Sequence, residues 1–410
     1  MTEINPDAER LIALLREAGR AIAAESFDET DWQRIVELAQ KQSVAPMLYA
    51  RLKERGIAPS PTAAQQLREI YLANAARNTW LLHEVGNIFR AFQAADIPVI
   101  PLKGACLAEA VYGNIALRPM GDVDLLVQPA DLAKALAVLR TLGYAAEHPF
   151  EVEVERQLNH DMPPLSKRGG VTLELHWTIA TPRCNARINK NDLDQLWSRA
   201  TAAKISNVQV LMLSPTDLLL HLCLHASVHH RFGGIGLGRF WDMALVIHRY
   251  GDAINWEQFT TCAHLWGITN GVHLALQLTE EWTAAVIPAH VVRALAPAIV
   301  DDAAIGWARH KIWNGISPAM QGSDVARLGK EHIAAKLAAL RDVPFPSRAS
   351  MASMYHAPAN SRRILFYYPV RFKDLWMRYG QTMWQLLWRD KTLTIEARQE
   401  ARLREYLGWN

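Results

Sequence analysis

The stretch that most constrains this chain is Gly121–Val127, where two acids stand two residues apart in an otherwise apolar run. In a β-strand, alternation would place Asp122 and Asp124 on one face and their apolar neighbours on the other. Two acids on one buried face repel each other, and their burial is costly unless a cation or donor compensates. The commonest use of such a pair is to hold Mg²⁺ through oxygen ligands. The pattern therefore predicts a buried strand that carries a cation site.

The same spacing recurs at Asp192 and Asp194, but in a different setting. These two acids follow a polar run and lead into an apolar-periodic segment. That context favours the start of a helix, with the acids near its positive end. We assign them no cation.

The segments around Asp122 give the pair its context. Residues 97–102 form a short β-branched run that ends at Lys103-Gly104, and residues 105–112 show helical periodicity. Residues 130–142 show a second helical pattern after the acidic strand. The predicted order is strand, turn, helix, acidic strand, helix and strand.

These residues resemble the uncharacterised bacterial nucleotidyltransferase family, within the DNA polymerase β-like superfamily. The resemblance covers about 97–180 and rests on Leu102-Lys103-Gly104, Arg118, Asp122–Val127, Gly143-Tyr144 and Leu173–Trp177. It implies an α+β fold, with a small mixed β-sheet core and α-helical regions before and after it.

The resemblance also implies a site and a reaction. Asp122, Asp124 and Glu174 would be the catalytic acids and would hold two Mg²⁺ ions. A nucleoside triphosphate, most simply ATP, would give its NMP to a hydroxyl of an unknown small-molecule, peptide or protein acceptor. Lys103 and Gly104 would meet the phosphates. The superfamily usually has Gly-Ser or Gly-Gly where this chain has Gly104-Ala105, so the phosphate contact of this chain must differ.

Several roles stay open at this point. Arg118 could neutralise a phosphate or pair with the acidic strand. His176, two residues after Glu174, could orient that acid, assist the acceptor or make a structural hydrogen bond. The three acids could instead form ion pairs with Lys103 and Arg118. A degenerate, non-catalytic protein that binds nucleotide or serves as a scaffold in a complex is the alternative function.

Composition narrows the class of protein. Half of the 410 residues are apolar, which predicts a globular chain, and the net charge of +3 argues against general nucleic-acid binding. The four scattered cysteines, Cys106, Cys184, Cys223 and Cys262, favour free thiols. With no signal peptide or membrane span recognised, we expect a cytoplasmic protein.

We predict four regions along the chain. Residues 1–96 are helical, with a long helix over 62–94. Residues 97–213 form the nucleotidyltransferase core, in which 151–155 is an edge strand, 167–170 a hairpin turn and 208–213 a last strand. Residues 214–345 form a helical domain. Residues 346–410 contain a loop, at 350–360, and a basic and aromatic helical tail.

The helical domain carries one notable pattern. His221, His225 and His229 share one helix face, and we favour packing histidines over a zinc site. The glycine-rich stretch 232–238 follows no strand, so it predicts a flexible interhelical loop rather than a dinucleotide loop. Arg239 and Asp242 are spaced as an ion pair.

The tail 361–390 interleaves arginines and lysine with aromatic residues. Such a helix can lie on a membrane or bind an acidic partner. The alternative is a helical hairpin that packs its aromatics on the domain and points its arginines outward.

Overall fold

The structure of the chain is a computed structural model. It describes residues 5–16, 27–180, 186–315, 345–355, 362–387 and 391–408, without the side chains of 378–387 and 391–394. Cys184 and the predicted helical residues 17–24 and 316–341 lie outside these ranges. Cys106 and Cys223 are buried free thiols and Cys262 is a partly buried one, as predicted for all three. No described helix is long and apolar enough to cross a membrane.

The N-terminal region is helical, as predicted. Its helices are α1 (Pro6–Leu15), α2 (Glu29–Lys41), α3 (Ala45–Glu54) and α4 (Pro61–Ala94). Ser60 caps α4 and proline takes its first position, which suits the start of a helix. The first part of α4 packs in the helical core through Leu67, and its last part packs against the sheet through Phe89 and Phe92. The predicted domain boundary at residue 96 therefore comes just after α4, a helix that contributes side chains to both hydrophobic cores.

The central sheet is mixed, as the α+β prediction requires. Its strand order is β1-β2-β5-β4-β3, and its strands are β1 (Val99–Leu102), β2 (Val123–Val127), β3 (Ala145–Ala146), β4 (Leu165–Ser166) and β5 (Leu173–His176). β1 runs antiparallel to β2, and β2 runs parallel to β5. The predicted turn at 167–170 joins β4 to β5. Both faces of β2 are buried.

Helices and a hairpin surround this sheet. They are α5 (Gly104–Ala110), η2 (Ile115–Leu117), α6 (Leu132–Thr141), α7 (Val152–Leu158), α8 (Lys190–Arg199), β6 (Thr201–Ile205) and β7 (Val208–Met212). β7 is the predicted last strand, and its partner β6 was not predicted. Asn189 caps α8 and Asp192 lies in its first turn, as the helix-start interpretation required.

The predicted edge strand at 151–155 is wrong, because these residues begin α7. Val152 packs toward the sheet core, while Val154 packs against Met351 and Ala352. In a strand both valines would share one face, whereas a helix turns them toward two different neighbours. The predicted loop at 350–360 is also wrong over 350–355. These residues belong to α17 (Arg348–Tyr355), in which Met351 and Ala352 are buried.

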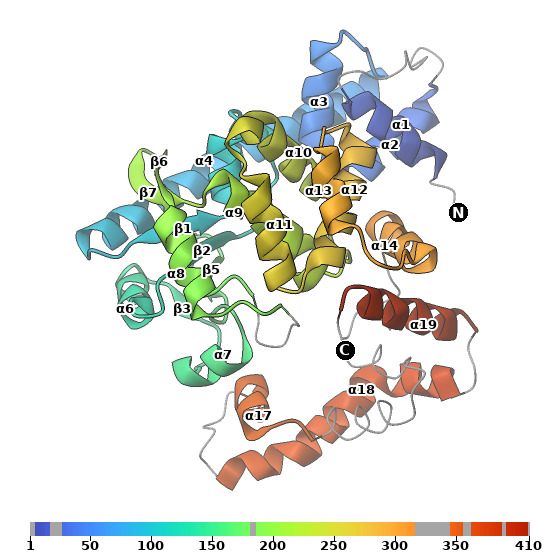
Figure 1. The fold of residues 1–410 in the computed structure, drawn as a ribbon. Coiled ribbons are helices and arrows are strands. Elements are labelled where there is room, and N and C mark those ends of the chain that lie inside the picture. Colours follow the sequence, from blue (N-terminus) through green and yellow to red (C-terminus); the bar gives the residue numbers. More distant parts are fainter. Residues whose placement is uncertain are drawn as a thin grey trace.

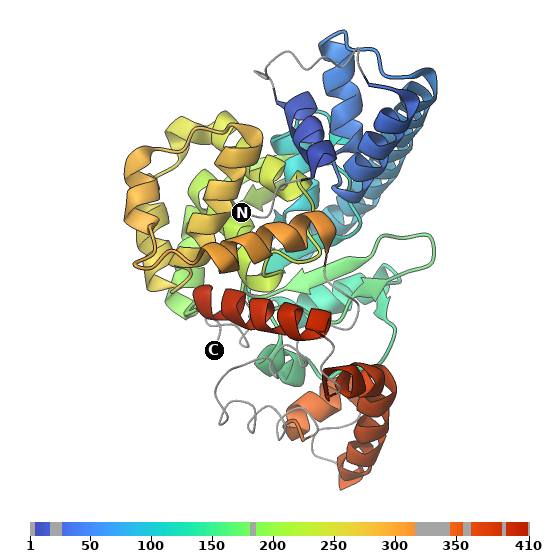
Figure 2. The same ribbon diagram turned by 90° about the vertical axis from the view of Figure 1, so that its right-hand side faces the viewer.

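The later helices form a bundle beside the sheet (Figure 1). They are α9 (Pro215–Leu224), the π-helical turn η3 (His225–His229), α10 (Gly238–Tyr250), η4 (Gly251–Ala253), α11 (Trp256–Leu265), α12 (Thr269–Thr283), α13 (Ala289–Leu295) and α14 (Asp302–Asn314). The tail adds η7 (Arg362–Phe366), α18 (Tyr367–Leu387) and α19 (Lys391–Tyr406). α19 lies along α14, whereas α18 lies at the edge of the molecule (Figure 2).

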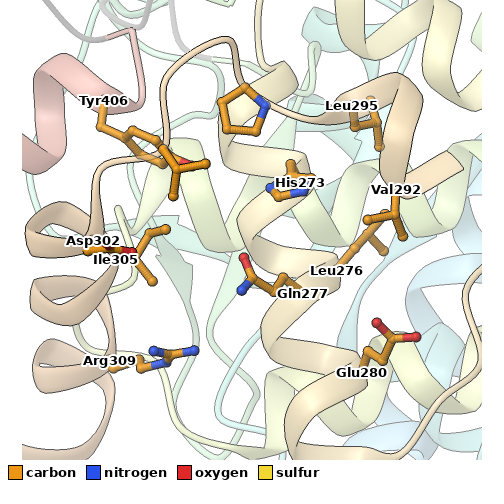
Figure 3. A pocket seen from close by; sticks show the side chains of 12 residues that line it. His273, Leu276, Gln277, Glu280, Val292, Leu295, Asp302, Ile305, Arg309 and Tyr406 are labelled. Carbon is orange, nitrogen blue, oxygen red and sulfur yellow. The ribbon is translucent and has the colours of Figure 1, made fainter. Parts of the chain in front are cut away.

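A cavity of about 330 Å³ lies between α12, α14 and α19. His273, Gln277 and Glu280 line one side, Arg309 faces them from α14, and Tyr406 closes one end (Figure 3). No set of three metal-ligating side chains among the described residues lies in it.

Candidate metal and nucleotide site

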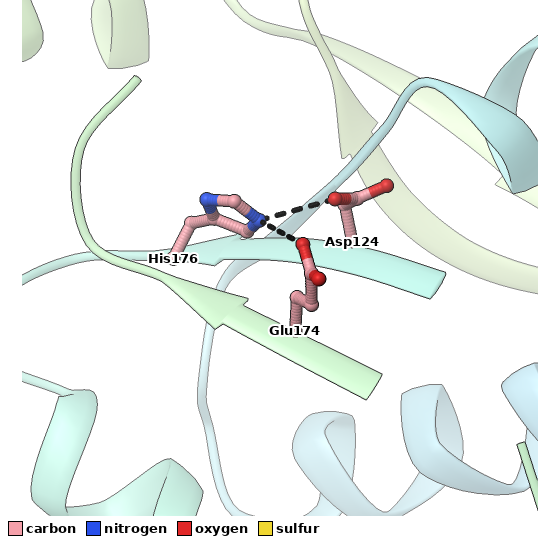
Figure 4. Close-up of side chains that lie close together, drawn as sticks. All are labelled: Asp124, Glu174 and His176. Carbon is pink, nitrogen blue, oxygen red and sulfur yellow. Dashed lines mark hydrogen bonds and ion pairs between the residues drawn. The ribbon is translucent and has the colours of Figure 1, made fainter. Parts of the chain in front are cut away.

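The register of two parallel strands builds the site. β2 and β5 pair so that Asp124 stands beside Glu174, and His176 follows on the same face of β5. Figure 4 shows the three side chains converging above the sheet. Each offers one ligand atom, and these atoms lie within 4.8 Å of one another. Among the described residues this is the one such group of three.

The imidazole of His176 joins the two acids. Its Nε2 lies 3.2 Å from Oδ1 of Asp124 and 3.7 Å from Oε2 of Glu174. Asp124 and His176 are both buried, while Glu174 is partly accessible. Burial alone would lower the pKa of His176, but its bonds to Asp124 and Glu174 raise that pKa to about 9. The imidazolium is therefore the favoured form at neutral pH.

Lys103 supplies the second positive charge. Its Nζ lies 2.6 Å from Oδ1 of Asp124 and 3.1 Å from Nε2 of His225, to which the ammonium donates. Burial would raise the pKa of Asp124, but Lys103 and His176 outweigh it and hold that pKa far below its usual range. Asp124 is therefore a buried carboxylate whose charge two cations balance.

Asp122 lies at the mouth of the same pocket. It precedes β2 and is not one of the three converging ligands. The residue as a whole is exposed, but it lines the pocket, where neighbouring atoms partly bury its carboxyl group. Burial, and then the charges of Asp124 and Glu174, raise the pKa of Asp122. The electrostatic coupling that the Asp122-Val-Asp124 spacing predicted is present, and the predicted ligand role of Asp122 stays a prediction.

Arg118 does not pair with the acidic strand. Its guanidinium makes two hydrogen bonds of 2.8 Å to the carboxylate of Asp242 in α10, and both side chains are buried. Tyr112 donates a third hydrogen bond to Asp242. This bidentate pair ties the segment before β2 to the helical bundle. Arg239 also reaches Asp242 at 3.6 Å, as the spacing of these two residues predicted.

Gly104 stands in a tight place next to two side chains. A Cβ there would lie 3.2 Å from a guanidinium nitrogen of Arg118 and 3.3 Å from the sulfur of Met120. The unusual backbone belongs instead to Lys103, whose φ is 48° and ψ −112°. Non-glycine residues rarely adopt such angles, and they do so mostly at functional sites.

The histidines of α9 and η3 border this pocket. His225 and His230 line the pocket, and the rings of His160 and His229 have centroids 4.4 Å apart. Burial, and next the charge of Lys103, lower the pKa of His221 to about 3. The burial and low pKa of His221 fit packing histidines, although neither ring nitrogen of His221 has a hydrogen-bond partner among the described residues. The preference for packing over a zinc site stays a prediction. The contacts of His225 with Lys103 and His230 were not predicted from the sequence.

The pocket itself is small and polar. Its volume is about 190 Å³, and Lys103, Gly104, Arg118, Asp122, Asp124, Glu174, His225, His230 and Arg239 are among the residues that line it. Six of the seven predicted site residues therefore meet in this cavity. The seventh, His176, lies directly against two of them.

The fold and the pocket together define an α+β protein with an acidic site on two parallel strands. A family model described as "Uncharacterised nucleotidyltransferase" matches residues 28–284, which is more than half of the chain. The chain belongs to this nucleotidyltransferase family, as the resemblance predicted.

One solved structure is similar to this chain. It is titled "Solution Structure of Antibiotic-Resistance Factor ANT(2'')-Ia Reveals Substrate-Regulated Conformation Dynamics". The match has 12% identity and a TM-score of 0.33, and it covers 50% of this chain and 98% of that one. No curated protein matches the chain.

Proposed function

We propose that this protein is a Mg²⁺-dependent nucleotidyltransferase that moves an NMP, most simply AMP from ATP, onto a hydroxyl of a small molecule, peptide or protein. The observation that carries the proposal is the convergence of Asp124, Glu174 and His176 within 4.8 Å, with Lys103 on Asp124. A nucleotidyltransferase needs an acidic cation site next to a phosphate site, and this pocket joins acids to basic groups.

The residues fit a hard cation. Asp122, Asp124 and Glu174 offer the carboxylate oxygens that Mg²⁺ prefers. Asp124 is buried and already attracts two positive groups. When bound, two Mg²⁺ would supply charge neutralisation at the phosphates and a lower pKa for the acceptor hydroxyl. His176 is better suited to orient Asp124 and Glu174 than to bind Mg²⁺, because Mg²⁺ favours oxygen over imidazole nitrogen.

Lys103 would serve the phosphates. An ammonium is a compact charge on a flexible stem and binds phosphate well. A lysine and a divalent cation repel each other at one carboxylate, so we infer that Lys103 turns from Asp124 to a phosphate oxygen in the loaded protein. Arg239, which is more accessible than Arg118 and has a longer contact to Asp242, is the better second phosphate group.

The pocket would take only part of the nucleotide. Its 190 Å³ is below the roughly 300 Å³ at which sites for drug-sized ligands begin. We infer that the phosphates enter the pocket while the base and the acceptor lie outside it. We place the catalytic unit at 97–213 and the acceptor contacts in the flanking helical regions. The free thiols support a reducing compartment such as the cytoplasm.

The test is calorimetry of Mg²⁺-nucleotide binding, with ATP, GTP, CTP and UTP in turn. We expect binding that needs the metal and that Asp122→Asn/Asp124→Asn loses. Glu174→Gln serves as a second variant, because Glu174 is partly exposed and its loss leaves the Lys103 contact with Asp124 intact.

The chain provides a matched control. Asp192→Asn/Asp194→Asn removes two acids of the same spacing from α8, and nucleotide binding should survive it. Binding unaffected by both site variants would contradict the proposed site. Metal-dependent binding without pyrophosphate release in a cell extract would favour the alternative, a protein that binds nucleotide as part of a complex.

A further inference from the structure

Exposed apolar side chains gather on one part of the tail. Fifteen large apolar side chains are exposed in the described part of the chain, and eight of them lie within 345–377. Phe366 is 77% exposed, Trp376 66% and Met377 67%. Isolated exposed apolar residues are ordinary, but a cluster of this kind marks a binding surface.

The inner side of this segment packs against the rest of the protein. Ile364 packs with Met351 against Val154 of α7. The hydroxyl of Tyr368 donates to the carbonyl of Pro346 at 2.8 Å. Tyr367 and Tyr368 thus pack inward, as the hairpin alternative predicted for the aromatic residues. Phe366, Phe372 and Trp376 remain outside, contrary to that alternative. The exposed apolar residues therefore lie on the solvent side of this segment, and its other side packs against the rest of the protein.

Helical spacing turns these residues to one outer surface. Val370, Lys373 and Met377 follow one another at intervals of three and four, and Phe372 and Trp376 are four apart. α18 lies at the edge of the molecule in both views (Figures 1 and 2). We call the α18 face the exposed surface of α18 and of the preceding η7, which consists of Arg362, Leu365 and Phe366 of η7 and Val370, Phe372, Lys373, Trp376 and Met377 of α18.

Charge accompanies the apolar residues. The stretch 345–377 has one acid, Asp374, which accepts a hydrogen bond from Tyr355. The same stretch carries five basic residues, Arg348, Arg362, Arg363, Arg371 and Lys373. Its net charge is therefore 5 − 1 = +4, although the whole chain has only +3. Two of these basic residues, Arg362 and Lys373, belong to the α18 face itself, so an apolar and anionic partner fits this surface.

We propose that the α18 face binds the surface of a membrane that contains anionic lipids. An outward helix side with mixed aromatic and basic residues fits a lipid interface, where rings enter the headgroup boundary and basic groups meet lipid phosphates. The long basic side chains can extend to the headgroups while the rings insert. The inference is independent of the nucleotidyltransferase reaction.

The experiment is co-sedimentation of the full chain with vesicles, either of phosphatidylcholine alone or with 30% phosphatidylglycerol added. We expect binding to the anionic vesicles that weakens as salt is raised, and much weaker binding to the neutral ones. Phe372→Ser/Trp376→Ser should weaken binding at least about tenfold at every salt concentration. Arg362→Gln/Lys373→Gln should weaken it about 30-fold at low salt, at about a fivefold loss for each basic group.

Matched variants elsewhere on the protein distinguish vesicle binding by the α18 face from nonspecific adsorption. Val286→Ser/Ile299→Ser replaces two apolar residues that are 82% and 80% exposed, and Lys41→Gln/Lys53→Gln removes two exposed lysines. Both should bind vesicles as the wild type does, with unchanged circular dichroism in all variants. The proposal is overturned by equal binding to both vesicle types, by α18 variants that bind like wild type, or by control variants that lose as much. It is also overturned if only an acidic protein, and no vesicle, is bound.

Discussion

Lys103 combines an unfavourable backbone with a central contact. Its φ of 48° and ψ of −112° suit glycine, yet its ammonium holds Asp124 and His225 together. Such strain costs on the order of 1–3 kcal/mol and persists only where the surroundings enforce it. The strain and the ion pair can be separated by comparing two substitutions that remove the same charge.

We expect Lys103→Gly to be more stable than Lys103→Ala by about 1 kcal/mol, because only glycine adopts these angles without strain. Both variants should lose nucleotide affinity alike. Urea unfolding followed by circular dichroism measures the difference.

Lys134 provides the reversed control. It is exposed within α6, where glycine costs about 1 kcal/mol relative to alanine. Lys134→Ala should therefore be the more stable of that pair. If Lys103 followed the same order as Lys134, its backbone would not be strained.

At the scale of elements, the glycine-rich segment 232–238 is a packed connection, not the flexible loop we predicted. Gln42, at the end of α2, is buried and accepts hydrogen bonds from Leu237 N at its side chain and from Gly238 N at its carbonyl. Its side-chain amide donates to the carbonyl of Ile312 in α14. One buried amide thus joins the N-terminal helices to two helices of the bundle.

We expect Gly236→Ala to destabilise the protein by about 1–3 kcal/mol, because a Cβ there would lie 2.6 Å from the carbonyl oxygen of Gln42. Thermal or urea unfolding checks this value. Gly251→Ala, which meets nothing within 4 Å, should change stability by no more than about 0.5 kcal/mol. Equal effects of the two substitutions would show that the segment yields to the added carbon.

At the scale of the whole molecule, the last helix of the tail, α19, packs against α14. Lys311 and Glu400 form an ion pair of 2.7 Å with both side chains buried, and Trp307 donates to the same carboxylate at 3.1 Å. Breaking a buried pair at one end leaves a charge without its partner, which costs more than the pair contributes. α19 is therefore an integral part of the helical bundle.

We expect Glu400→Leu to cost about 3–5 kcal/mol of stability, and Lys311→Met/Glu400→Leu to regain at least about 1 kcal/mol of it. A double-mutant cycle by urea unfolding measures both values. Arg402→Gln, which removes an exposed arginine from its pair with the partly buried Asp301, should cost less than about 1 kcal/mol. A double variant no more stable than Glu400→Leu would place the loss in packing or in the other partners of Glu400, Arg231 and Arg404, which lie 3.6 Å from its carboxylate.

Local sequence determined the elements whose signals lie within a few residues. Alternation predicted β2, helical periodicity predicted most of α4, and the polar run at Asp192 predicted the start of α8. The structure shows a serine cap followed by proline at the starts of α4 and α9. The family motifs predicted Asp124, Glu174 and the turn at Lys103 as a site, and the roles of these residues stay predictions. The elements could be predicted because each depends on neighbours in the chain.

Only the tertiary structure decided which distant groups meet. Arg118 pairs with Asp242, 124 residues away, and Lys103 reaches His225, 122 residues away. The residues 151–155 became a helix because apolar partners stand on two sides of them. A charged side chain takes the partner that the packed chain brings near it, and a short amphipathic segment takes the shape that buries its apolar groups. Both outcomes depend on contacts that no local pattern encodes.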